Sequence, residues 1–277
     1  MKISNLQPEK YNRLFVFGCS MTKYIWPTWA DIIAQDISTY VNWGRPGAGN
    51  HYIFNAVMEC DAKYSFTKDD LVIIMWSSIE REDRYKTNDW IIAAGDAKAE
   101  VYGNKWISKF DCTRGSLIRD LALIKAVQSL LDAKSCDWAN LSMYALCTFD
   151  EEYIISQGPF NEDQVIDRYN AQHRNLCDGI VTFDPYIKDA DVLKVYADVY
   201  KNLEYSIEDQ IFDGKLGRGP RPNNNDFHPS PLEHLKYLDL IWPRNTLSDC
   251  ARQYAADWDV QVWDGTFKFS PQPTIRL

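Results

Sequence analysis

Short apolar runs alternate along the chain with longer amphipathic segments, and this alternation limits the possible folds more than any other feature. We predict a strand at residues 70–76, which is continuously apolar from Leu71 to Trp76, as expected for a strand that is covered on both faces. Residues 13–18 and 39–43 are two further strand candidates. Residues 116–134 carry apolar side chains at steps of three and four, which predicts a helix. Strands that alternate with helices favour an α/β fold with a mostly parallel sheet.

The remaining segments extend this pattern over the 277 residues, which we interpret as one domain. Thr28 and Asp31 have the spacing of a capping box, which predicts a helix ending near Ile37. Asn50 is placed to cap a helix ending near Ala62. We expect an insert at about residues 80–111, whose fold the sequence does not predict. We also expect strands at 141–146 and 260–263, helices at 161–176, 190–212, 232–241 and 247–258, and a loop at 214–226.

Composition and charge argue against several classes of protein. Hydrophobic residues make up 45% of the chain, too many for a disordered protein. The formal net charge of −9 argues against a nucleic-acid backbone or an anionic membrane as the main partner. The longest apolar run is far shorter than the roughly 20 residues of a membrane span. The polar N-terminal segment does not resemble a signal peptide, so we expect a cytoplasmic protein, with association with a virus particle as the alternative.

Cysteine and histidine positions argue against a metal site. The seven cysteines are scattered without a C-x-x-C pair, which favours free thiols in a reducing compartment over a disulfide framework or structural zinc. The four histidines show no H-x-x-x-H spacing. We therefore expect neither a metal nor another cofactor.

The candidate site residues follow the predicted strands, because ligands bind at the carboxyl ends of the strands in parallel sheets. Ser20 lies in a tight turn after the first strand, where it is either a nucleophile or only a turn residue. Gly47 and Gly49 follow the second strand and let backbone N–H groups approach a ligand. Asn50 either caps a helix or donates its amide to an oxyanion. Near the C-terminus, Asp226 and His228 suit an orienting carboxylate and a general base, or form an ordinary lead-in to a helix.

Aromatic and basic residues near the strand ends are candidates for substrate binding. Trp26 and Trp76 offer flat faces to a sugar, although core packing is the simpler interpretation of either tryptophan. Arg81 is suited to hold an anionic group, although a surface ion pair explains it as well.

Taken together, Gly18-Cys19-Ser20, the glycines at 47 and 49, and Asp226 with His228-Pro229-Ser230 resemble the SGNH (GDSL-type) hydrolase family, in particular members from tailed phages and marine bacteria. The resemblance implies a three-layer, flavodoxin-like sandwich and metal-free hydrolysis of acylated sugars, lipids or other small esters. It implies Ser20 as nucleophile, His228 as base and Asp226 as the residue that orients His228. The N–H groups of Ser20 and of Gly47 or Gly49 would contribute to an oxyanion hole.

The chain differs from the family pattern at three positions. Cys19 stands where the family has aspartate. Asn225 stands three residues before the histidine, the usual place of the aspartate, and is therefore an alternative to Asp226. The third strand is followed by Ser77-Ser78 and lacks the usual asparagine, so Ser78 or Asn50 would have to supply its hydrogen bond.

Two functions follow from these observations. The first is a serine esterase that removes acetyl groups from a carbohydrate or another small ester. The second is a weakly active or inactive SGNH-like virion or accessory protein, used for attachment or assembly, with virion proteins or a second copy of the chain as partner.

Overall fold

A central sheet with helices on both faces organises the computed structural model, which describes residues 3–79, 81–93, 97–144, 196, 198–199, 202–207, 228–243, 246–267 and 275–276. The strand order is β7-β6-β3-β1-β2-β8, with parallel pairing except at β8. The strands are β1 (Arg13–Phe17), β2 (Thr39–Asn42), β3 (Asp70–Trp76), β6 (Asp137–Ser142), β7 (Leu203–Ser206) and β8 (Ile275–Arg276). The α/β fold with a mostly parallel sheet is therefore as predicted.

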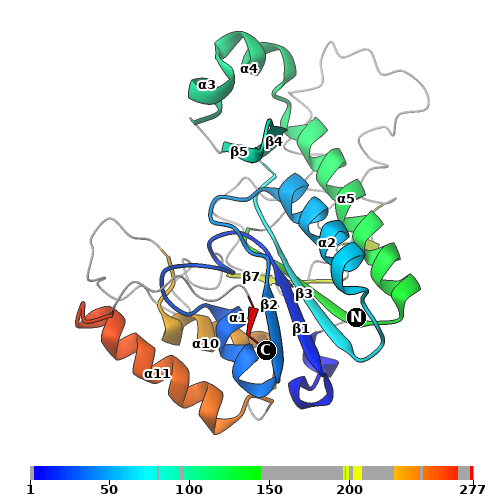
Figure 1. The fold of residues 1–277 in the computed structure, drawn as a ribbon. Coiled ribbons are helices and arrows are strands. Elements are labelled where there is room, and N and C mark those ends of the chain that lie inside the picture. Colours follow the sequence, from blue (N-terminus) through cyan, green and yellow to red (C-terminus); the bar gives the residue numbers. More distant parts are fainter. Residues whose placement is uncertain are drawn as a thin grey trace.

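Helices cover the sheet in two groups. On one face, α2 (Asn50–Tyr64) packs beside α5 (Thr113–Lys134). On the other, α1 (Trp29–Ile33) packs against α10 (Pro231–Ile241) and α11 (Asp249–Trp263), as Figure 1 shows. Short 3-10 helices are η1 (Ile3–Asn5), η2 (Pro8–Lys10) and η3 (Ala34–Asp36).

The central strands form where the apolar runs predict them. All seven residues of β3 are buried, because β1 and β6 flank this strand and helices cover both of its faces. At its start, the Asp70 carboxylate accepts hydrogen bonds from Arg13 Nε at 2.7 Å and Nη2 at 2.6 Å, across the β1–β3 pair. The Arg13–Asp70 pair supports the register in which β1 and β3 begin together. Their carboxyl ends therefore lie at the same edge of the sheet.

Three predictions about secondary structure are wrong. The strand expected at 141–146 is β6, which begins at Asp137, because its polar Asn140 is buried and accepts a hydrogen bond from Trp76 Nε1 at 3.0 Å. Part of the helix expected at 190–212 is β7, an edge strand formed by pairing with β6. The strand expected at 260–263 belongs to α11, whose buried residues recur at helical spacing. The predictions for 161–176 and 214–226 concern residues outside the described ranges.

The insert expected at 80–111 contains its own small structure. An antiparallel hairpin, β4 (Glu82–Lys86) and β5 (Asp89–Ala93), is separate from the main sheet. Two short helices follow, α3 (Ala97–Tyr102) and α4 (Asn104–Phe110). These elements lie at the end of the molecule where α2 and α5 begin, at the top of Figure 1.

Candidate active site

The turn after β1 presents Ser20 at the edge of the sheet. Gly18 has φ +156°, and a Cβ there would lie 2.1 Å from Thr22 Oγ1 and 3.0 Å from the Met75 carbonyl oxygen, so only glycine fits. The carbonyl of Cys19 accepts hydrogen bonds from the N–H groups of Thr22 and Lys23 and closes the turn. Ser20 itself is 7% exposed. The neighbouring Cys19 side chain is fully buried and packs in the core.

The segment carrying His228 packs directly onto the chain that follows Ser20. The His228 ring stacks on Tyr24 with 3.8 Å between ring centroids. Beside it, Trp26 Nε1 donates a 2.8 Å hydrogen bond to the Pro229 carbonyl, across 203 positions of sequence. Two segments from opposite ends of the chain therefore lie in contact.

The start of α10 fixes the backbone next to His228. Ser230 caps the helix, accepting from Glu233 N at 3.4 Å, and its own N–H donates to Glu233 Oε2 at 2.8 Å. This capping box holds the chain two residues after His228. Asp226 and Asn225 lie outside the described residues, so the choice between them as the orienting residue stays a prediction.

The hydroxyl of Ser20 makes no hydrogen bond with the residues that the structure describes. The structure therefore contains no Ser20–His228 hydrogen bond, and the pairing of these two residues in catalysis stays a prediction. The burial of Ser20 and the placement of His228 on Tyr24 are the observations that bear on it.

The loop after β2 leaves one of the two candidate glycine amides free. Gly49 N donates to Asp83 Oδ1 at 3.0 Å, while the other carboxylate oxygen accepts from Tyr52 N at 3.0 Å. Asp83, from β4, thus occupies the N-terminus of α2, and burial raises the pKa of its carboxyl against the effect of these two hydrogen bonds. Gly49 therefore does not serve as an oxyanion donor. Gly47, with φ +84°, keeps its N–H free of the described residues.

Asn50, Ser77 and Asp120 form a hydrogen-bonded cluster, called the clamp below. This arrangement corrects both roles expected for Asn50. Its Oδ1 accepts from Ser77 N at 2.7 Å, and its Nδ2 donates to Ser77 O at 3.0 Å and Asp120 Oδ2 at 2.7 Å. Both amide hydrogens are thus used, so none is left for an oxyanion. The N-cap of α2 is Gly49, and Asn50 is the first residue of the helix.

Asp120 is a buried acid that the sequence interpretation missed. It lies on α5 within the apolar stripe of Leu117 and Leu121, and an acid at a core position was the available signal. Burial raises the pKa of Asp120 to about 6, while Arg119, at 2.7 Å, and the Asn50 amide oppose that rise. The clamp therefore includes a group that titrates near neutral pH.

Residues 77–79 and 81 follow β3 at the carboxyl edge of the sheet. Ser77 is buried and Ser78 is half-buried. Arg81 donates from Nη1 to the Ala48 carbonyl at 2.8 Å, and its Nη2 lies 3.6 Å from Met143 Sδ. Met143 Sδ also lies 3.3 Å from Cys19 Sγ. Arg81 therefore braces the loop after β2, and a contact with substrate stays a prediction.

The two tryptophans expected to bind a sugar are in the interior. Trp76 ends the central strand, is 0% exposed and bonds Asn140. Trp26 is 5% exposed and holds Pro229. Neither ring has a face open to a ligand, so the simpler interpretation, core packing, is correct for both.

The described ranges bear on metal and membrane binding. No group of three or more histidine, cysteine or acidic side chains within them is arranged to hold a metal ion. None of the helices in those ranges has the length and apolar character needed to cross a membrane.

Comparison with known proteins gives structural matches at low identity. No family model matches the chain, and no curated protein matches it. A GDSL-like lipase from Bacteroides thetaiotaomicron matches with a TM-score of 0.35 and 12% identity, over 95% of this chain and 92% of that chain. The Bacillus subtilis protein YXIM matches with a TM-score of 0.35 and 12% identity, over 92% of this chain and 57% of that chain. A Bacteroides fragilis protein assigned as an acylhydrolase matches with a TM-score of 0.28 and 14% identity, over 69% and 86%. At these TM-scores the likeness carries no argument about activity.

Proposed function

We propose that this chain hydrolyses small acyl esters through an acyl-serine intermediate on Ser20, with acetylated carbohydrate as the substrate class. The observation that carries the proposal is the meeting of the Ser20 turn with the His228 segment, through the stacked Tyr24 ring and the Trp26–Pro229 hydrogen bond. A buried serine at the carboxyl edge of a parallel sheet is placed where ligands of such sheets bind.

The proposed reaction has two steps. Ser20 Oγ attacks the acyl carbonyl while His228 accepts its proton and passes it to the leaving alcohol. Water then attacks the acyl-serine, with His228 again as base, and releases the acid. Asp226 is proposed to orient the imidazole and to stabilise its charged form.

The oxyanion of each step is proposed to bind the N–H groups of Ser20 and Gly47, with the Ser78 hydroxyl as third donor. Gly49 and Asn50 are excluded from this role because their N–H groups are bound to Asp83, Ser77 and Asp120. A missing oxyanion donor costs on the order of 10²–10³ in rate. We therefore expect slower turnover than from a site with an asparagine after β3.

The test is hydrolysis of p-nitrophenyl acetate by the wild type, by Ser20→Ala and by Ser129→Ala. Ser129 is an exposed serine on α5 whose hydroxyl donates to Lys125 O, so it serves as a matched control. We expect Ser20→Ala to lose at least about 10³-fold in kcat/KM and Ser129→Ala to lose nothing. Activity retained by Ser20→Ala with an unchanged circular dichroism spectrum would reject the assignment.

A binding or assembly protein on the same scaffold is the second candidate. It is favoured by the prior engagement of the Gly49 and Asn50 amides and by the absence of an asparagine after β3. This candidate predicts no turnover by wild type on p-nitrophenyl acetate or on acetylated glycans.

A further inference from the structure

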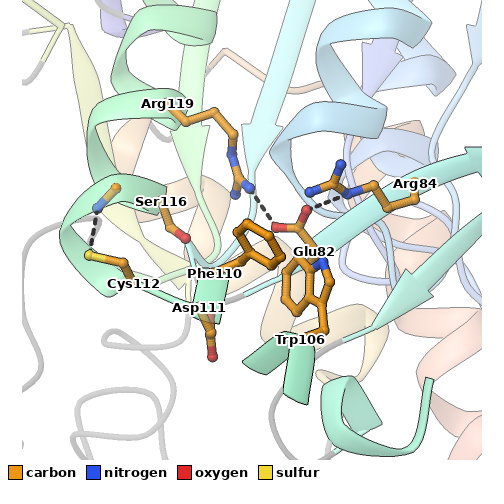
Figure 2. Close-up of a pocket in the computed structure, with 9 residues that line it drawn as sticks. Glu82, Arg84, Trp106, Phe110, Asp111, Cys112, Ser116 and Arg119 are labelled. Carbon is orange, nitrogen blue, oxygen red and sulfur yellow. Dashed lines mark hydrogen bonds and ion pairs between the residues drawn. The ribbon is translucent and has the colours of Figure 1, made fainter. Parts of the chain in front are cut away.

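A recess lies between the insert and α5, and no residue of the Ser20 turn lines it. It is a pocket of about 390 Å³, within the range typical of small-molecule sites. Its walls come from β4, from α4 and from the first turns of α5 (Figure 2). None of the residues assigned above to the ester reaction lines it.

The charges that line this pocket are already compensated. The two oxygens of Glu82 accept hydrogen bonds from Arg84 Nε and Arg119 Nη1, each at 2.7 Å, as drawn in Figure 2. Asp111 is paired with Lys98 at 2.8 Å. The two acidic and two basic side chains of the lining balance, so the pocket offers no net charge to a ligand, and displacing an arginine from the buried Glu82 carboxylate is costly. The balance of charge therefore favours a neutral ligand.

The remaining lining offers flat apolar faces beside hydrogen-bond donors. Trp106 and Phe110 are one helical turn apart, with ring centroids separated by 5.8 Å, and Phe110 is 58% exposed. The Arg84 guanidinium lies 5.7 Å from the centre of the Trp106 ring. The two Nη groups of Arg84 make no hydrogen bond with the residues that the structure describes. The Ser116 hydroxyl likewise makes no hydrogen bond with them. Aromatic faces with polar donors at their edge suit a ring that has C–H groups on its face and hydroxyls around its rim.

A chain of contacts joins the pocket to the Ser20 turn. Arg119 Nη2 donates to the Arg81 carbonyl at 3.3 Å. The Arg81 side chain contacts Met143, which in turn contacts Cys19, the residue before Ser20. These contacts connect the pocket, through Arg81 and Met143, to the edge of the sheet where the ester reaction is proposed.

We propose that this pocket binds a neutral pyranose ring, stacked on the exposed Phe110 ring beside Trp106, which is tilted by 44° to Phe110, and hydrogen-bonded by Arg84 and Ser116. Its role as a subsite for the alcohol part of the substrate rests on the proposed function, whereas the binding of a neutral sugar does not. Binding at such a subsite supplies energy that positions the reacting ester.

The experiment is calorimetric titration of the wild type with cellotriose, xylotriose and N-acetylated chitotriose, and with trigalacturonate as the charged counterpart. We expect one of the neutral trisaccharides to bind, with no tighter binding of trigalacturonate. Phe110→Ala should weaken that binding about tenfold, because it removes a stacking face from a solvent-exposed position. Tyr85→Ala is the control, because Tyr85 is a 62% exposed aromatic of the same insert and does not line the pocket.

Three results would overturn the proposal: no binding of any neutral trisaccharide, tighter binding of trigalacturonate, or equal affinities of wild type and Phe110→Ala. The ester assay above is independent of these titrations. Sugar binding without p-nitrophenyl acetate hydrolysis would reject the esterase and keep the pocket. Hydrolysis that depends on Ser20, without binding of any neutral trisaccharide, would reject the sugar-binding proposal and keep the esterase.

Discussion

Around Ser20, residues far apart in the sequence meet in the interior, whereas the pocket of the insert is lined by residues between positions 82 and 119. Asn50, Ser77 and Asp120 are buried, and each hydrogen bond of the Asn50 amide is made. In the insert, Phe110 is exposed and Arg84 keeps donors free of the described residues. We therefore expect substitutions around Ser20 to lower stability, and substitutions in the pocket to change binding with little effect on the fold.

The largest contrast is expected between two glycines with positive φ. Gly18→Ala places a Cβ 2.1 Å from Thr22 Oγ1 in a backbone conformation that alanine rarely adopts, so we expect a loss of about 4 kcal/mol in the free energy of unfolding. Gly103→Ala, between α3 and α4, has φ +81° and no atom within 4 Å of its new Cβ. It should lose only about 1–2 kcal/mol, from backbone strain alone. Urea unfolding measures both, and equal losses would remove the contrast between the rigid edge and the insert.

The next effect is a pH dependence of stability from Asp120. Since its pKa is raised to about 6 in the folded state, the native protein holds a proton that the unfolded chain has released between the ordinary aspartate pKa and that value. The free energy of unfolding should therefore fall as pH rises through this window, by up to about 3 kcal/mol from this group.

The matched variant is Asp120→Asn, which cannot titrate. Urea unfolding at several pH values should show a smaller decline for this variant than for wild type over the same window. Parallel curves for the two proteins would show that Asp120 does not titrate there.

The smallest of the three effects compares two asparagines of α2. Asn50→Ala leaves the buried N–H and carbonyl of Ser77 without their partners, so we expect a loss of about 2 kcal/mol in the free energy of unfolding. Asn55→Ala removes only a hydrogen bond to the His51 carbonyl in a half-buried place and should lose less than about 1 kcal/mol. If Asn55→Ala lost as much as Asn50→Ala, the clamp would have no special role.

The sequence predicted those parts of the fold that local patterns determine. The apolar run of β3 has the predicted bounds, and the α5 helix follows from its spacing of apolar residues. In contrast, β7 is a strand only because β6 pairs with it, and pairing between distant segments leaves little trace in four residues. The polar Asn140 hid the start of β6 because its partner, the Trp76 indole, is 64 positions away.

The candidate site also has parts that the sequence predicts and parts that it does not. The Ser20 turn was predictable because Gly18 is required by its backbone and by its neighbours. The engagement of Asn50 and Gly49 was not, because their partners, Asp120 and Asp83, come from other elements. The burial of Trp26 and Trp76 depends on how segments far apart in the sequence pack, which composition does not reveal.

The central claim, a reactive Ser20 served by His228, is tested most directly by a fluorophosphonate, which forms a covalent bond with activated serines. After reaction, intact mass and peptide mapping would locate the adduct. We predict a single adduct on Ser20, formed by wild type and by Ser129→Ala but lost in Ser20→Ala and strongly slowed in His228→Ala. An adduct elsewhere, or no adduct on a folded wild type, would contradict the account.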